Sequence, residues 1–202
     1  MTDSPLLNLA RVIDCTRAEG PGLRFCVWTQ GCLQKCPGCC NSAMQPLEAR
    51  EMVSPSFLGE RLAHAQSAFG VEGVTFLGGE PILQAHGLAE VARFAQSRGL
   101  SVIVFTGYTI AECASFPYSA DLLAATDVVV DGPFIAEMPE RFRNWVGSAN
   151  QRFHYLTSRY NSSIETAEKF RNVVELRENG GRLFLNGCPS VISRCTVALP
   201  HA

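Results

Sequence analysis

The chain has 202 residues, of which 47% are hydrophobic and 18% charged, and its formal net charge at pH 7 is −2. These values suit one globular domain, residues 1–202, and give no reason to expect nucleic acid or an anionic membrane as the main partner. No apolar run approaches the roughly 20 residues that a membrane span needs.

The first residues, MTDSPLLNLARVID, contain no basic stretch leading into an apolar core, so we expect no secretory signal. Nine cysteines without such a signal indicate a reducing, cytoplasmic compartment. In that setting, clustered cysteines bind metal or do redox chemistry more often than they form disulfides.

Short β-branched or aromatic runs alternate with helical patterns along the chain. The first predicted strand, 24–31, leads into a cysteine-rich loop. Residues 54–70 predict a helix, with Ser54 as its cap and Pro55 in its first turn. The residues expected on its inward face are Leu58, Leu62, Ala65 and Phe69.

A second strand is predicted at 73–77, followed by a helix at 82–99 that ends at Gly99. A third strand, 101–106, is followed by two short helices around Pro117. The inward residues of the 82–99 helix are Leu88, Val91, Ala92 and Ala95.

Two further strands are predicted at 127–132 and 152–158. The tail then predicts a helix over 162–181, with a capping box between Ser162 and Glu165 and a Gly-Gly end. A last strand follows at 182–187.

Strand–helix alternation with near-continuously apolar strands predicts an α/β fold in which helices cover a parallel sheet. In such sheets the functional residues lie in loops after the carboxyl ends of the strands. Each unusual motif of this sequence falls at one of those ends.

The loop after the first strand carries Cys32, Cys36 and Cys39 in a C-x3-C-x2-C arrangement. Three thiolates in one tight loop can bind three corners of a cubane iron–sulfur cluster, which leaves the fourth iron open to a small molecule. A structural zinc site, the alternative, usually needs two separated ligand pairs, and no second C-x2-C follows. Cys40 is an additional thiol, which could be a bystander, a fourth ligand or a redox-reactive group.

The C-x3-C-x2-C spacing is the signature of radical S-adenosylmethionine (radical SAM) enzymes. The surrounding stretch EGPGLRFCVWTQGCLQKCPGCCN, 19–41, resembles the activating enzymes of glycyl-radical proteins, and among them most closely those of anaerobic ribonucleoside-triphosphate reductase. The further matching segments are FLGGEPILQ (76–84), VFTGYT (104–109), VVDGPF (129–134) and GSANQR (147–152).

The resemblance covers residues 8–157 and has departures. Glu19 stands where Asp is usual, and Cys40 stands where His or Tyr is common. Residues 158–202 form an extension, with the predicted helix and last strand. The short reductase activators lack such a tail.

The resemblance implies a partial (β/α) barrel of about five or six parallel strands. It also implies a [4Fe–4S] cluster held by Cys32, Cys36 and Cys39, whose open iron binds SAM. Reductive cleavage of SAM then gives a 5′-deoxyadenosyl radical that abstracts hydrogen from a glycine of a partner enzyme. A reductant such as flavodoxin or ferredoxin and an anaerobic setting are further implications.

The resemblance assigns the SAM amino group to the segment formed by Gly78, Gly79, Glu80 and Pro81. Two glycines let backbone approach a ligand closely, although the segment could also be a plain strand–helix turn. Gly38 could leave space for adenine or could be required by its own turn.

Four polar residues further along the chain are candidates for contacts to SAM, two at strand ends and two just before the fifth strand. The Thr106 hydroxyl could reach the SAM carboxylate or ribose, and Asp131 needs a polar partner after an apolar strand. That partner could be SAM, a cation, a target loop or the following turn. Asn150 and Arg152 could contact SAM or a partner loop, or could serve a structural hydrogen-bond network.

Two other functions stay open from the sequence. The chain could be a radical SAM enzyme that modifies a peptide or small molecule, or a metalloprotein that carries electrons without catalysis. A run of arginines is either a solvated strip or a docking patch. Its members are Arg141, Arg143, Arg152 and Arg159.

Overall fold

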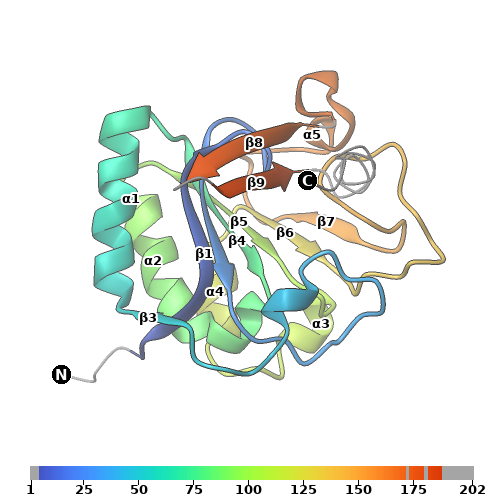
Figure 1. Cartoon of the computed structure of the whole chain (residues 1–202), viewed down its shortest axis with the longest axis horizontal. Coiled ribbons are helices and arrows are strands. Elements are labelled where there is room, and N and C mark those ends of the chain that lie inside the picture. The colour runs from blue at the N-terminus through green and yellow to red at the C-terminus, as the bar shows by residue number, and fades with distance from the viewer. Residues whose placement is uncertain (1–4, 172, 180–181, 188–202) are drawn as a thin grey trace.

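The computed structural model describes residues 5–171, 173–179 and 182–187. Seven strands form one sheet in the order β3-β1-β2-β4-β5-β6-β7 (Figure 1). Its strands are β1 (Leu7–Thr16), β2 (Arg24–Thr29), β3 (Glu51–Val53), β4 (Gly73–Gly78), β5 (Ser101–Phe105), β6 (Val128–Asp131) and β7 (Arg152–Tyr155).

The four central strands β2, β4, β5 and β6 run parallel, whereas β1, β3 and β7 run antiparallel to their neighbours. The α/β class with a mostly parallel centre is therefore confirmed. The expectation of five or six parallel strands is wrong, because only four strands of the main sheet run parallel. The predicted fifth strand is β7, which pairs with β6 in the opposite direction. Its direction reverses because the connection 132–151 returns without the crossover helix that a parallel pair needs.

The sequence patterns do not predict β1 and β3. The register between β1 and β2 shifts between Leu9 and Arg11 and again between Ile13 and Thr16. Such bulges break the regular alternation that identifies a strand from sequence. β3 has only three residues.

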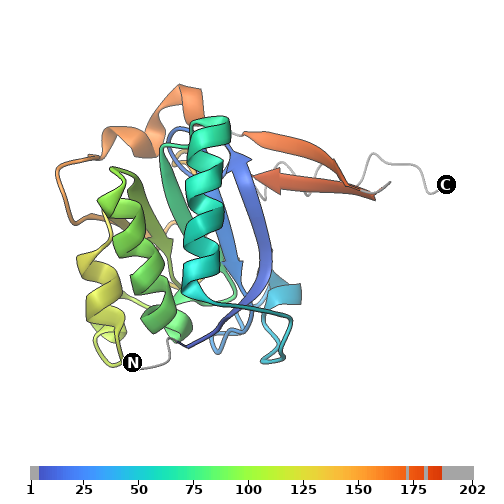
Figure 2. The same ribbon diagram turned by 90° about the vertical axis from the view of Figure 1, so that its left-hand side faces the viewer.

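Three helices cover one face of the sheet: α1 (Pro55–Phe69), α2 (Ala85–Ser97) and α4 (Ser119–Ala124) (Figure 2). The short helix α3 (Ile110–Cys113) precedes α4, so both helices predicted around Pro117 are confirmed. Among the described residues, no helix is both long and apolar enough to cross a membrane.

The ends of α1 are as predicted. Ser54 Oγ accepts a hydrogen bond from the Phe57 amide at 3.1 Å, and Gly70, with a φ of 71°, ends the helix. The predicted inward face is wrong at Phe69, which is 49% exposed and packs edge-on against the His64 ring. The other three predicted inward residues of α1 are buried, as are all four of α2.

α2 begins later than predicted, because Pro81–Gln84 form a 3-10 turn before it. The main core lies between the sheet and these helices. Fully buried side chains that fill it include Phe25, Val27, Phe76, Leu62 and Leu88. Each apolar residue removed from water here stabilises the fold by about 1.5–3 kcal/mol.

Arg24, at the start of β2, is completely buried and connects the beginnings of three parallel strands. Its guanidinium donates to Thr75 Oγ1 at 3.0 Å, to the Val74 carbonyl, and to the hydroxyl of Ser101. Burial lowers the pKa of Arg24, and its hydrogen bonds offset the cost of desolvating the charge. The arginine of the GPGLR motif thus has a structural role at the amino ends of β2, β4 and β5.

The C-terminal part differs from the prediction. The predicted helix over 162–181 is wrong, because α5 (Ser163–Thr166) has four residues and is followed by a 3-10 turn, Glu168–Phe170. The strand predicted at 182–187 is confirmed as β9 (Arg182–Gly187), but it pairs with β8 (Val174–Asn179) in a separate hairpin. The predicted Gly-Gly helix end, 180–181, and residues 188–202 of the extension lie outside the described residues.

Tertiary contacts explain this difference. Ser162 makes no capping bond, and the Glu165 carboxylate instead accepts from the Tyr155 hydroxyl at 2.8 Å. Further along, Glu175 accepts from Thr16 Oγ1 at 2.7 Å, and Arg177 donates to a carbonyl of β1. Alternate residues of β8 therefore face β1, and the hairpin lies on the side of β1 away from α1 (Figure 2).

Replacing Arg24 with Met keeps much of the side-chain volume but leaves buried oxygens of β4 and β5 without this donor. We expect the free energy of unfolding to fall by about 2–4 kcal/mol. Urea denaturation of the wild type and the Arg24→Met variant measures this. A loss below about 0.5 kcal/mol, the usual range of surface substitutions, would contradict the structural role.

Candidate iron–sulfur and SAM site

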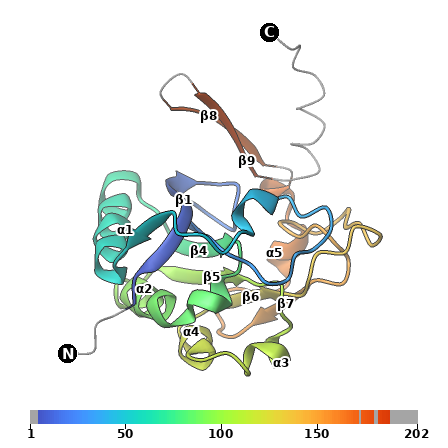
Figure 3. The same ribbon diagram turned by 60° about the horizontal axis from the view of Figure 1, so that its bottom comes forward.

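The cysteine loop leaves the carboxyl end of β2 and is closed at its base by backbone hydrogen bonds. The Gly31 amide donates to the Met44 carbonyl at 2.8 Å, and the Cys32 amide donates to the Gln45 carbonyl at 3.0 Å. Residues 32–44 therefore form a closed lobe, which crosses above the strand ends (Figure 3). This closure holds the three predicted ligands in one place.

The three predicted ligands, Cys32, Cys36 and Cys39, are free thiols on this loop. Cys32 is buried, and the other two are partly exposed. Burial raises the pKa of Cys32, although backbone amides of Gln34 and Lys35 donate to its sulfur and act in the opposite direction. Amides directed at a ligand sulfur are among the groups that tune protein-bound iron–sulfur clusters.

Cys39 is activated by its neighbours. A hydrogen bond from the Cys40 thiol, helped by the Asn41 amide, lowers the pKa of Cys39 to about 6 against the effect of burial. The same bond raises the pKa of Cys40. Thiolates are the form that binds metal, so these surroundings suit a ligand at Cys39. Cys40 contacts this ligand without sharing the spacing of the other three.

The residues present fit a cubane cluster. Within the described ranges, no three His, Cys, Asp or Glu side chains converge on one metal ion. A cubane cluster does not require such convergence, because each thiolate binds a different iron. Three free thiols on one closed loop, two of them receiving backbone amides, are the donor set that such a cluster needs.

Gly38 lies between two of these ligands, with a φ of 74° that favours glycine. A Cβ there would be 3.5 Å from the Phe134 ring, an ordinary contact, so the backbone conformation is what requires glycine. The contact also places the cysteine loop beside the segment that follows β6 (Figure 3).

Gly78 and Gly79 bring the end of β4 against the base of the cysteine loop. A Cβ on Gly78, whose φ is 113°, would lie 2.6 Å from the Thr29 nitrogen, and one on Gly79 would lie 2.4 Å from the Gly31 carbonyl oxygen. Hydrogen bonds link the same segments, since the Glu80 amide donates to the Gly31 carbonyl at 2.8 Å. Both glycines are therefore needed for a close backbone contact.

Glu80 and Thr106 join the ends of β4 and β5. The buried Glu80 carboxylate accepts from Thr106 Oγ1 at 2.8 Å, from the Gly107 amide at 2.9 Å and from the Ile82 amide at 2.9 Å. Burial raises the pKa of Glu80, although these three hydrogen bonds oppose the shift. Pro81 begins the following 3-10 turn. The structure thus brings together the predicted residues of two strand ends.

Asp131, at the end of β6, is buried, accepts one backbone hydrogen bond and lies beside a histidine. Its Oδ2 accepts from the Ile110 amide at 2.7 Å and lies 3.0 Å from His154 Nε2 of β7. The carboxylate therefore joins β6 to α3 and β7, and the sequence pattern gave no sign of His154 as its partner.

The segment before β7 has a largely structural hydrogen-bond network. Asn150 Nδ2 donates to the Pro133 carbonyl at 2.8 Å, while its Oδ1 is buried without a partner in the described chain. Gln151 Oε1 accepts from two amides, those of Gly147 and Ser148. Arg152 is exposed and opposes Asp131 in the β6–β7 register, so it lies at the same edge of the sheet.

Sequence reasoning did not identify Glu19 and Arg11 as an interacting pair. Burial raises the pKa of Glu19 to about 8, and the charge of Arg11 partly opposes this shift. The Arg11 guanidinium lies 5.2 Å from the centre of the Trp28 ring, on the sheet face opposite the helices. The unusual acid of the GPGLR approach is therefore a partly buried group.

The Glu80–Thr106 bond generates a double-mutant prediction. Glu80→Leu removes the acceptor from three donors, and we expect it to cost about 1–3 kcal/mol of unfolding free energy; Thr106→Val costs about 1 kcal/mol. Because both variants remove the same bond, the double variant should lose less than the sum. Denaturant unfolding measures all three. Strict additivity would show that the two side chains do not act together.

Glu19 predicts a pH dependence of stability. Its folded pKa of about 8 lies above the ordinary value, so the folded state holds a proton that the unfolded chain releases. Stability should therefore fall as the pH rises from about 5 to about 8, and Glu19→Gln should reduce this fall by at least about 1 kcal/mol. Unfolding at a series of pH values tests this. Parallel curves for both proteins would be the opposing result.

The profile of the 4Fe-4S single cluster domain family matches residues 18–154. The anaerobic ribonucleoside-triphosphate reductase-activating protein of Vibrio cholerae is 31% identical over 145 residues, which cover 69% of this chain and 92% of that protein. The protein of the same name from Enterobacteria phage T4 is 25% identical over 150 residues, or 72% and 92% of the two chains.

A third relative has a different name. The pyruvate formate-lyase 1-activating enzyme of Escherichia coli is 30% identical over 142 residues, which cover 68% of this chain and 56% of that enzyme. The family match includes all three thiols and the ends of β4, β5 and β6. The chain therefore belongs to the 4Fe-4S single cluster domain family, among the radical SAM activating enzymes of glycyl-radical proteins.

Proposed function

We propose that this chain is a radical SAM activase that generates a glycyl radical on a partner enzyme. The observation that carries the proposal is the closed three-thiol loop, with amides directed at its sulfurs, beside the joined ends of β4 and β5. When bound, the cluster and SAM supply the electron transfer and the carbon radical that side chains cannot provide. The chain's own residues hold, orient and shield these groups.

We assign the cluster to Cys32, Cys36 and Cys39, which would bind three of its four irons. The burial of Cys32 keeps water from one side of that site. The hydrogen bonds at Cys32 and Cys39 stabilise negative charge on sulfur, which affects the reduction potential of a bound cluster.

We assign the SAM amino group to the segment Gly78–Pro81. The amides of Gly79 and Glu80 donate to carbonyls at 2.8 Å within the protein, so the segment's carbonyl oxygens are the groups suited to accept from an ammonium. Glu80 holds this segment in place through Thr106, whose hydroxyl also accepts from the Tyr108 amide. Thr106 would then contact SAM while orienting the ends of two strands.

The remaining cofactor contacts are assigned to residues around the same edge. Gly38 is assigned to adenine, which could lie over the cysteine loop beside the Phe134 ring. The buried Oδ1 of Asn150 has no partner in the described residues and could accept a hydrogen bond from SAM. Arg152 is exposed and could bind the SAM carboxylate. Asp131 would fix this edge through His154 and α3 or accept from SAM directly.

The names of the relatives favour an anaerobic ribonucleoside-triphosphate reductase as the partner, and a pyruvate formate-lyase is the second candidate. We further propose a partial barrel, in which the sheet curves around the face that carries Trp28. The electron donor would be a flavodoxin or ferredoxin, in an anaerobic cytoplasm.

A different substrate, such as a peptide or small molecule, is favoured by one observation. The β8–β9 hairpin lies beyond the family match and packs on residues just before the GPGLR segment. It could therefore reshape access to the face of the sheet opposite the helices.

Anaerobic turnover tests the proposal. The protein is reconstituted with iron and sulfide, reduced and mixed with SAM, and 5′-deoxyadenosine is quantified with and without the partner. We expect Cys36→Ala to reduce product to background because the cluster loses one of its three ligands. Cys15→Ala, which alters a half-buried thiol of β1, is the matched control and should retain activity.

Electron paramagnetic resonance of the partner then distinguishes a protein substrate from a peptide or small-molecule substrate. A glycyl radical that depends on SAM and on Cys36 supports the activase. Product formation without a glycyl radical on either candidate partner would favour the peptide or small-molecule alternative. No product with a full cluster and both partners present would contradict both.

A further inference from the structure

The connection between β6 and β7 contains a small, closely bonded projection, residues 138–149, which we call the knuckle. Its two sides are joined by a bridge between Pro139 and Ser148 and by the Ala149 amide, which donates to the Met138 carbonyl at 2.7 Å. The knuckle therefore has the hydrogen bonding of a hairpin, although it is a long surface connection.

Glu140 fixes the turn of the knuckle. Its Oε1 accepts from the amides of Arg141 and Phe142 at 2.8 Å, and its Oε2 accepts from Arg143 Nε at 2.6 Å. Burial raises the pKa of Glu140, but these hydrogen bonds outweigh it and lower the pKa to about 2. The turn is thus held by an ionised carboxylate at any pH near neutrality.

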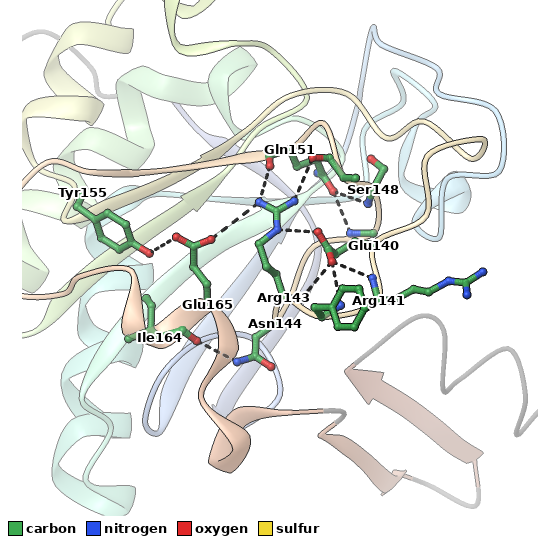
Figure 4. A network of polar contacts seen from close by, with 12 residues as sticks. Glu140, Arg141, Arg143, Asn144, Ser148, Gln151, Tyr155, Ile164 and Glu165 are labelled. Atoms are coloured by element: carbon green, nitrogen blue, oxygen red, sulfur yellow. Dashed lines mark hydrogen bonds and ion pairs between the residues drawn. The ribbon is translucent and has the colours of Figure 1, made fainter.

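Arg143 fixes the base of the knuckle. Its guanidinium donates to the Gln151 carbonyl at 2.8 Å and to the Ala149 carbonyl at 3.1 Å, and it lies 3.9 Å from Glu165 of α5 (Figure 4). The next residue, Asn144, donates to the Ile164 carbonyl at 2.9 Å. The knuckle is therefore attached rigidly to the rest of the fold.

The tip of this rigid projection carries exposed apolar and cationic side chains. Phe142 is 72% exposed, and the Arg141 side chain points away from the network (Figure 4). Met138, at the base of the knuckle, is 44% exposed. An aromatic side chain on a pre-organised backbone loses little conformational entropy on binding, which is typical of an interface anchor.

The structure also divides the arginine run found in the sequence. Arg143 is an internal clamp, and Arg159 donates to the Gly99 carbonyl near the start of β5, at the opposite end of the sheet. Arg141 and Arg152 are the exposed members that remain beside the strand ends. The four arginines therefore have different surroundings and do not form one continuous surface strip.

The knuckle lies next to the proposed site. The Phe134 ring is 3.0 Å from the position of a Cβ on Gly147, in the knuckle, and 3.5 Å from one on Gly38, in the cysteine loop. One aromatic ring thus separates the two loops. A protein loop that reaches the cluster from this side would have to pass the knuckle.

We propose that the knuckle is a docking surface for the protein substrate of this chain, with Phe142 as its apolar anchor and Arg141 as its cationic contact. The inference rests on the proposed activase function. The matching surface on the glycyl-radical enzyme is an apolar pocket bordered by acidic side chains, because such a pocket complements both exposed groups.

The test uses the full chain and the anaerobic ribonucleoside-triphosphate reductase of the same genome, with titanium(III) citrate as the reductant. The partner is titrated, and glycyl radical is measured by electron paramagnetic resonance. We expect Phe142→Ala and Arg141→Glu each to raise the partner concentration at half-maximal rate by about tenfold. The maximal rate and the cleavage of SAM without partner should not change.

Two matched controls lie on the helical face. Phe57→Ala removes a comparably exposed aromatic residue of α1, and Arg93→Glu reverses an exposed charge of α2; both should titrate like the wild type. Wild-type titration curves for the two knuckle variants would overturn the docking proposal. A slower reduction by flavodoxin with an unchanged partner titration would also overturn it, since the electron donor would then be the occupant.

If the proposed activase function is wrong, the outcome differs from that of a wrong docking surface. If the wild type cleaves SAM but forms no glycyl radical on the reductase, the choice of partner is wrong. The titration is then repeated with pyruvate formate-lyase. No radical there either would overturn both the activase function and the docking proposal that rests on it.

Discussion

The site depends on a close backbone approach between two strand ends. Gly79 lies so near the Gly31 carbonyl that a Cβ would be 2.4 Å from its oxygen, and a Cβ on Gly78 would be 2.6 Å from the Thr29 nitrogen. This contact places the base of the cysteine loop against the end of β4. The Glu80 carboxylate then extends the connection to Thr106 at the end of β5. Thiols and strand ends far apart in sequence therefore meet at one edge of the sheet.

Local patterns predicted the centre of the fold well. The strands β2, β4, β5 and β6 and the helices α1 and α2 have strong apolar periodicity, and α1 has a cap at each end. The patterns failed where tertiary contacts decide the structure. β1 is interrupted by bulges, and β8 takes an extended form through Glu175 and Arg177, although its sequence has a helical pattern.

The candidate site was predictable in part, for a physical reason. The three thiols lie within one short loop, so their spacing along the chain was enough to identify them as ligands. Which partner a buried charge finds depends on strands far apart in the chain. The contacts of Asp131 with His154 and of Glu19 with Arg11 therefore needed coordinates. The same holds for Glu140, whose four bonds fix a turn, residues 140–143, that carries no sequence motif.

The central claim is that hydrogen passes from a glycine of the partner to the 5′-deoxyadenosyl group of SAM. Partner enzyme produced with deuterated glycine is mixed anaerobically with reduced, cluster-loaded protein and SAM, and the 5′-deoxyadenosine is analysed by mass spectrometry. The account predicts that the product gains a single deuterium in step with the glycyl radical. Unlabelled 5′-deoxyadenosine formed beside a full radical signal would contradict direct abstraction from glycine.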